Sequence, residues 1–243
     1  MHTAGTGGPL VLEAMRTDQS DVAIRHGLAY ATTPEVGRFA ALDEDTERAW
    51  QDLGRITDTA IVERDADFEP AGWTLERRTA LTSMFTTTRS TAAADHAGVV
   101  DLGVDDVPAM VGLATLGGIR TFAPGSVGRF AHVGVVTDGQ LVAMAGARFS
   151  TPEWQEIACV VTHPDHRGQG HAHVLVDLLV ARARRAGRAS CLRVEVGNPA
   201  RQVYERMGFV AAHTTTVDLR RRARATTDPT RPVAPGVLVD TNG

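Results

Sequence analysis

The chain has 243 residues and a mass of 25.9 kDa, which is the size of one or two ordinary domains. Hydrophobic residues make up 43% of the chain and charged residues 22%, and these fractions exclude a collagen-like, fibrous or wholly disordered protein. The formal net charge of −4 and the isoelectric point near 6.1 give no reason to expect that the chain as a whole binds nucleic acid.

The sequence also favours a cytoplasmic protein without a membrane partner. No apolar run reaches the roughly 18 to 20 residues that a membrane-spanning helix needs, and residues 1–12 lack the pattern of a secretory signal. The two cysteines, Cys159 and Cys191, are too few for a disulfide framework, so a reducing compartment is the simpler setting.

The first part of the chain contains short predicted elements and no chemical motif. Asp45-Thr46 can cap a short helix, because the apolar residues that follow recur at helical spacing. Strands are expected at 59–62 and, with imperfect alternation, between 73 and 85. The segment 86–97 is small and polar and indicates a linker. We therefore expect residues 1–97 to form an N-terminal α/β region that acts as a scaffold or as the acceptor side of a site.

The spacing of apolar residues indicates helices and strands more clearly in residues 98–222 than in the first part of the chain. Asp138-Gly139 supplies the positive φ of a tight hairpin turn between two apolar runs. The predicted order is a helix from 105, strands at 130–136, 141–149 and 156–162, a helix at 171–185, a strand at 192–196, a helix at 198–208 and a strand at 209–219. This order predicts an α/β sandwich with a mixed sheet, followed by a flexible C-terminal tail at 223–243.

The segment 163–172, HPDHRGQGHA, lies between a predicted strand and a predicted helix. Gly168 and Gly170 let backbone amides approach a ligand without obstruction by a Cβ atom, and the positive end of the helix dipole lies behind them. These features predict a cradle for a pyrophosphate, in which Arg167 adds charge or holds the shape of the loop. A tight turn with incidental glycines is the alternative from the loop alone.

Two other glycine-loop families fit less well. A dinucleotide fold wants a third glycine where this chain has His173, and a P-loop wants a lysine, of which the chain has none.

The wider pattern resembles the GCN5-related N-acetyltransferase (GNAT) superfamily. The acyl-CoA motif of that family, R/Q-x-x-G-x-G/A, is matched by Arg167, Gly170 and Ala172. The stretch 198–209, NPARQVYERMGF, is similar to the second signature of the family, and LVAMAGARF ahead of EIACVVTHP most resembles its FR47-like branch. The resemblance covers about 105–219 and implies the GNAT fold, a mixed twisted sheet flanked by helices, here with an N-terminal α/β extension.

The resemblance implies a site for acetyl-CoA as the acyl donor. The strand before the loop would splay from its neighbour, so that the amides of pantetheine pair with the backbone of Val160, Val161 and Thr162. The pyrophosphate would bind the backbone amides of the loop, which are those of Arg167, Gly168, Gln169, Gly170, His171 and Ala172. Asn198 would contact pantetheine, although asparagine at this position is equally suited to cap a helix.

The resemblance also assigns catalytic roles. Tyr204 corresponds to the general acid that protonates the departing thiolate, which a thiol pKa near 8.5 and a tyrosine pKa near 10 make feasible. Glu156 resembles the glutamate that serves as a base in several members, acting through water. The alternatives are a packing role for Tyr204 and a structural role for Glu156.

Other features are weaker signals. The four histidines at 163, 166, 171 and 173 lack partners at zinc-binding spacing, so no metal is expected. Cys159 has no neighbouring base and is expected to be a small buried residue. The chain from Arg220, beginning RRRARA, is expected to be solvated, with an anionic partner as the alternative.

The sequence therefore predicts an N-acyltransferase that moves an acetyl group from acetyl-CoA to a primary amine of a small molecule or peptide. A non-catalytic acyl-CoA-binding module and an O-acyltransferase are the alternatives. A homodimer is also expected, because family members often dimerise and the strand at 209–219 would leave an open sheet edge.

Overall fold

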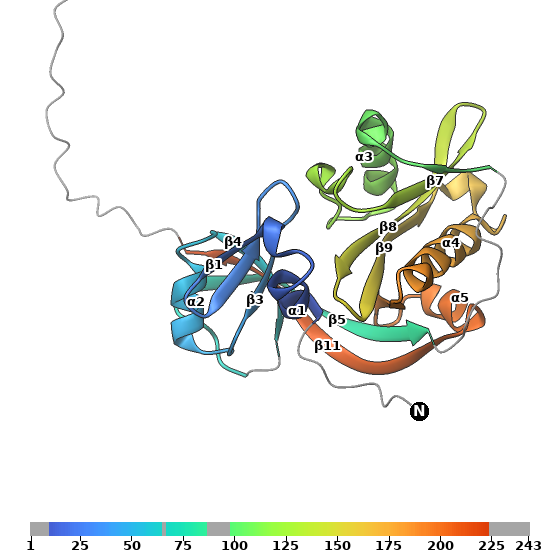
Figure 1. The fold of residues 1–243 in the computed structure, drawn as a ribbon. Helices are drawn as coiled ribbons and strands as arrows, with labels where there is room; N and C mark the ends of the chain where they lie inside the picture. The colour runs from blue at the N-terminus through green and yellow to red at the C-terminus, as the bar shows by residue number, and fades with distance from the viewer. Residues whose placement is uncertain (1–9, 65–66, 87–97, 224–243) are drawn as a thin grey trace, which may run out of the picture.

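The computed structural model describes residues 10–64, 67–86 and 98–223 (Figure 1). Among them, a single sheet runs through the whole molecule in the order β1-β2-β3-β4-β11-β5-β10-β9-β8-β7-β6. The strands are β1 (Ala23–His26), β2 (Ala29–Thr32), β3 (Phe39–Leu42), β4 (Thr59–Arg64), β5 (Trp73–Thr86), β6 (Val99–Asp101), β7 (His132–Thr137), β8 (Gln140–Ser150), β9 (Trp154–Thr162), β10 (Ala189–Glu195) and β11 (Phe209–Arg222). The α-helices are α1 (Leu10–Arg16), α2 (Glu47–Leu53), α3 (Val107–Leu116), α4 (His171–Arg185) and α5 (Ala200–Arg206).

Most elements predicted after residue 98 form where the sequence places them. The predicted helix at 171–185 is α4, and the predicted strand at 156–162 lies within β9. The turn between β7 and β8 has φ values of 50° at Asp138 and 77° at Gly139, which is the left-handed geometry that a two-residue hairpin turn requires. In the N-terminal part, the Thr46 hydroxyl accepts a hydrogen bond from the Ala49 amide at 3.3 Å and caps α2 as predicted.

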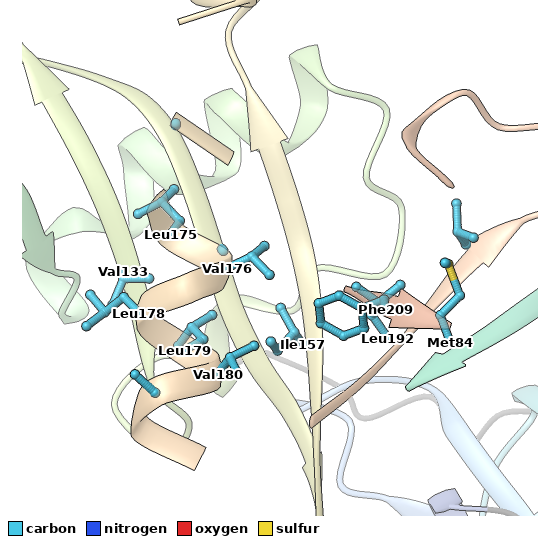
Figure 2. Packing of buried hydrophobic residues seen from close by; sticks show 14 residues of the cluster. Met84, Val133, Ile157, Leu175, Val176, Leu178, Leu179, Val180, Leu192 and Phe209 are labelled. Atoms are coloured by element: carbon cyan, nitrogen blue, oxygen red, sulfur yellow. The ribbon is translucent and has the colours of Figure 1, made fainter. Parts of the chain in front are cut away.

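Helices cover both faces of the central strands. α4 packs on the face that includes Ala143 and Ala145 of β8, whereas α3 packs on the face that includes Met144. Because side chains alternate along a strand, α3 and α4 lie on opposite sides of the sheet. Figure 2 shows the apolar stripe of α4, including Leu175 and Leu179, turned toward Ile157 and Leu192 of the sheet.

The position of β5 is the main departure from the expected organisation. The sequence suggests a division at residue 97, but β5, from before that point, pairs with both β10 and β11. The N-terminal part therefore contributes a central strand to the same sheet as the rest of the chain. In Figure 1, β5 and β11 curve together beneath α4 and α5 toward the N-terminal strands.

The prediction that β11 has an open edge is correct for only the first half of the strand. Thr216–Arg221 pair with β4 and Phe209–Arg222 pair with β5, so the second half of β11 has a partner on each side. Only Phe209–Thr215 have a strand on one side alone within the described residues. Pairing of a second copy along that half stays a prediction.

The arginine run that begins at Arg220 is also placed differently from the expectation. Arg220–Arg222 are the last residues of β11, and Arg220 is completely buried against Asp218. Arg221 and Arg222 are about half exposed and pair with Glu76 and Asp58 at the surface, so of these three arginines only Arg220 is withdrawn from solvent. The predicted tail at 223–243 lies outside the described residues except for its first residue.

Candidate active site

The site begins where two parallel strands separate. β9 and β10 pair only from Trp154–Ile157 to Ala189–Leu192. Beyond that point β9 stays with β8, whereas β10 continues along β5. The predicted splay is therefore present, and the backbone of Val160, Val161 and Thr162 faces the gap without a strand partner from β10.

A bulge in β9 marks the same place. Cys159 has a φ of 55°, and the register between β8 and β9 shifts by one residue beside it. A bulged residue bends its strand and increases the local twist, which turns β9 away from β10. Burial raises the pKa of the Cys159 thiol, so it stays protonated and is unsuited to act as a nucleophile.

A cleft of about 580 Å³ opens at the splay. Both parts of the chain line it, because the sheet curls and brings the N-terminal strands opposite β9 and β10. Of the predicted site residues, it contains Val160, Asn198 and Tyr204. The residues that the N-terminal part adds include Arg38, Phe39, Ile61, Glu63 and Arg77.

The glycine loop leads from the end of β9 into α4. Gly168 and Gly170 have φ values of 77° and 83°, and a Cβ atom added at either would meet no other atom of the described structure within 4 Å. The loop is therefore open on the side where a ligand would approach. The first amides of α4 have no partner within the helix, as in any α-helix. The Arg167 guanidinium donates to the Thr162 carbonyl at 3.4 Å and so holds the loop to β9.

Asn198 has the geometry of a cap. Its side-chain oxygen accepts a hydrogen bond from the Ala200 amide at 2.9 Å, where α5 begins. Its side-chain nitrogen has no hydrogen-bond partner in the described parts of the chain, and the residue lines the cleft. The geometry leaves that nitrogen available to a ligand.

Tyr204 projects from α5 into the same cleft. Its ring packs edge-to-face on Phe209, with 6.1 Å between the ring centroids. Burial raises the pKa of Tyr204 to about 12, so the phenol stays protonated at neutral pH.

Glu156 lies in a buried ion-pair network. It is completely buried, and its two oxygens accept hydrogen bonds at 2.8 Å from Arg148 and Arg193. Burial alone would raise the pKa of Glu156, but the charges of Arg148 and Arg193 outweigh it and lower the pKa to about 2. A carboxylate so weakly basic and so fully engaged is poorly placed to take a proton from an amine. The geometry favours a structural role for Glu156.

Sequence reasoning missed the partners in this network. Arg148 is the one charged residue of β8, whereas Arg193 and Glu63 lie in strands that contain one further charged residue each, Glu195 and Arg64. A charged residue within a largely apolar strand is seldom buried without a partner, and that signal could have indicated a partner for Arg148. Which arginine meets which carboxylate depends on pairing between distant strands.

The histidines of the loop contact nearby acidic residues and one another. His173 pairs with Asp177 at 3.1 Å, and the rings of His163 and His166 meet edge to face. No group of three or more His, Cys, Asp or Glu side chains within residues 10–64, 67–86 and 98–223 is arranged to hold a metal ion. The Nε2 atom of His171 is buried and has no hydrogen-bond partner in the same ranges.

Comparison with known proteins identifies the class. Residues 119–209, which span β7 to α5 and most of the cleft, match the model of the acetyltransferase (GNAT) family. The matched segment therefore contains a GNAT acetyltransferase domain, and this supports acyl transfer in general. A comparison with curated proteins gave no match. Among the described residues, no helix has the length and apolar character needed to cross a membrane.

Solved structures extend the likeness beyond that segment. A GNAT-family protein from Novosphingobium aromaticivorans is 28% identical with a TM-score of 0.79, over 87% of this chain and 96% of that chain. A GCN5-related N-acetyltransferase from Kribbella flavida is 18% identical with a TM-score of 0.55, over 87% of this chain and 92% of that chain. At 18% identity, the likeness to the Kribbella flavida protein shows that the two chains share a fold and nothing more. The likeness to the Novosphingobium aromaticivorans protein covers the N-terminal strands as well as the GNAT segment.

Proposed function

We propose that the protein transfers an acetyl group from acetyl-CoA to a primary amine, by direct transfer while both substrates are bound. The observation that carries this proposal is the junction of the splayed strands with the open glycine loop at the start of α4. Pantetheine has two amides, which match the unpaired backbone of a strand edge, and its pyrophosphate matches free amides at a helix N-terminus.

The residues that bind acetyl-CoA would be those of the strand edge and loop. Val160, Val161 and Thr162 would pair with pantetheine, and Asn198 would donate its side-chain nitrogen to the same arm. The amides of the loop would hold the pyrophosphate, from Arg167 and Gly168 through Gln169, Gly170, His171 and Ala172. The Nε2 atom of His171, which is buried and has no hydrogen-bond partner among the residues that the structure describes, lies at the same position.

The chemistry would use few side chains. The amine nitrogen attacks the thioester carbon, the carbon–sulfur bond breaks, and the departing thiolate takes a proton from the Tyr204 phenol. The ammonium that forms in the product loses a proton to water, since Glu156 is bound by two arginines. Tyr204 recovers its proton from solvent, so the balance is one acetyl group moved and one thiol released.

A substitution in the loop tests the binding site. Gly170→Val places a branched side chain at a left-handed position in the open cradle, and we expect acetyl-CoA binding by calorimetry to be lost while circular dichroism is unchanged. Gly187→Val is the matched control, because Gly187 has a φ of 76°, an equally open environment and a position past the other end of α4. Unchanged affinity in folded Gly170→Val would remove the loop from the site.

A second measurement separates catalysis from mere binding. Release of free CoA thiol is followed with acetyl-CoA and a panel of primary amines and alcohols. Amine-dependent release supports the proposal. Release with alcohols alone would indicate an O-acyltransferase, and tight binding without release would indicate a binding module.

A further inference from the structure

The cleft contains more positive than negative charge. Five arginines line it, at 38, 77, 120, 148 and 193, together with two glutamates, at 63 and 195. Three of these arginines have carboxylate partners. Arg77 pairs with Glu195 at 3.1 Å, Arg193 pairs with Glu63 and Glu156, and Arg148 pairs with Glu156.

The remaining two arginines, Arg38 and Arg120, differ from the others. Both are exposed, and neither side chain has a hydrogen bond or an ion pair within the described residues. Three arginines are balanced by Glu63, Glu156 and Glu195, so the excess positive charge of the cleft is that of these two residues.

Arg38 and Arg120 come from different parts of the chain, but the residue that follows each of them contacts the same buried side chain, that of Arg148. Phe39, the neighbour of Arg38, has its ring centroid 4.8 Å from the guanidinium carbon of Arg148. Thr121, the neighbour of Arg120, accepts a hydrogen bond from Arg148 at 3.4 Å. The backbone at Arg38 and the backbone at Arg120 therefore approach the same region of the cleft, and both arginines line it.

That region is separate from the place where the phosphates of CoA would bind. Arg120 follows α3, which covers the face of the sheet opposite α4. Arg38 precedes β3, in the N-terminal part of the sheet. The glycine loop, by contrast, lies at the start of α4. The two arginines are therefore placed to meet the acceptor.

We infer that the acceptor is an amine that also carries an anionic group, a carboxylate or a phosphate, and that Arg38 and Arg120 bind this group. The inference rests on the function proposed above and names its substrate class. Guanidinium groups bind carboxylate and phosphate through paired, charge-assisted hydrogen bonds. An acceptor held by its anionic group can direct its amine toward the thioester beside Val160. A polycationic amine would instead meet two uncompensated positive charges, which disfavours binding.

Matched pairs of amines test the inference. γ-Aminobutyrate is compared with butylamine for the carboxylate, and phosphoethanolamine with ethanolamine for the phosphate, with release of CoA thiol as the readout. We expect kcat/KM to be at least about tenfold higher for the anionic member of one pair, the effect of one charge-assisted hydrogen bond. The pair that discriminates identifies the anionic group.

Variants then assign the effect to residues. Arg38→Gln and Arg120→Gln should each lower kcat/KM for the anionic amine by about tenfold, leave the neutral amine unchanged and leave the KM for acetyl-CoA unchanged. Arg185→Gln is the control, since Arg185 is an exposed arginine at the end of α4 with no partner in the described chain.

Three results would overturn the inference. Equal rates for the anionic and neutral members of both pairs would show that the acceptor needs no negative charge. A raised KM for acetyl-CoA in the arginine variants, with unchanged discrimination between amines, would assign the two arginines to CoA. Absence of acetyl-CoA binding to the wild-type protein would overturn the proposed function, and this inference with it.

Discussion

The carboxylate of Glu63 lies 3.1 Å from the guanidinium of Arg193, although β11 and β5 separate their strands in the sheet. Three strand spacings correspond to about 14 Å in a flat sheet. Curling of the sheet and the length of the two side chains together close that distance. Through this contact the N-terminal part of the chain forms part of the wall of the cleft, and that part of the chain can therefore shape the acceptor site.

Arg193 also contacts a buried carboxylate further inside the structure. It binds Glu156, which binds Arg148, so four charged side chains connect β4 with β10, β9 and β8. Removing a member of a buried pair leaves its partner's charge uncompensated, which is more costly than the pair itself is stabilising.

The first prediction concerns Glu156→Gln. We expect it to lower the free energy of unfolding by about 3 to 5 kcal/mol, measured by urea denaturation, because two nearly buried arginines lose their shared partner. Glu76→Gln is the control, since Glu76 pairs with Arg221 at the surface and should change stability by less than about 1 kcal/mol. A stable Glu156→Gln protein with greatly reduced turnover would instead restore Glu156 as the base.

The pH dependence of stability tests the same group. The folded pKa of Glu156, about 2, lies below the ordinary value of 4.5, so its contribution is present above pH 4.5 and is lost as the pH falls toward 2. That difference corresponds to about 3 kcal/mol. We expect the loss of stability of the wild type between pH 5 and pH 2, in acid denaturation curves, to be smaller in Glu156→Gln. Superimposable pH profiles would contradict this assignment.

The local elements of the fold could be predicted from the sequence. The bounds of α4, the hairpin turn at Asp138-Gly139 and the cap of α2 each depend on residues a few positions apart. The glycine loop and its place between β9 and α4 are local in the same sense.

The long-range pairing could not be predicted. β5 pairs with β10 and β11, more than a hundred residues later, and its alternation is compatible with several neighbours. The environment of Glu156 depends on that pairing, because Arg148 and Arg193 come from the strands on either side of it. The sequence also could not predict that Arg38 and Arg120 line one cleft, because they are 82 positions apart in a chain rich in arginine.

The second prediction separates the two roles of Asn198. Asn198→Asp keeps the oxygen that caps α5 but loses the side-chain N–H, whereas Asn198→Ala loses both. We expect only the alanine variant to lose about 1 kcal/mol of stability, and both variants to bind acetyl-CoA more weakly by calorimetry. Wild-type affinity in the aspartate variant would show that Asn198 is a helix cap alone.

The third prediction concerns the junction between β11 and the N-terminal strands. Asp218 is completely buried and contacts Arg78, Arg220 and Arg64. Asp218→Asn removes one of the two carboxylates that each of the buried arginines Arg64 and Arg220 contacts, and should cost about 3 kcal/mol in urea denaturation. Asp58→Asn, which weakens an exposed pair with Arg222, should have little effect. Equal stability of the two variants would show that the junction does not depend on the buried charges.

The last prediction is that Tyr204 protonates the departing sulfur of CoA. Tyr204→Phe keeps the ring that packs on Phe209, so the fold and the affinity for acetyl-CoA should barely change. Loss of the proton donor should lower kcat by about 10² to 10⁴ with an acceptor that the wild type uses. The loss should be smaller with a thioester whose leaving thiolate needs no proton, because the hydroxyl then contributes little. Since burial raises the pKa of Tyr204 to about 12, ionisation of the phenol should not reduce the rate of the wild type below about pH 11. A phenylalanine variant with the wild-type kcat would make Tyr204 a packing residue and leave protonation of the sulfur to water.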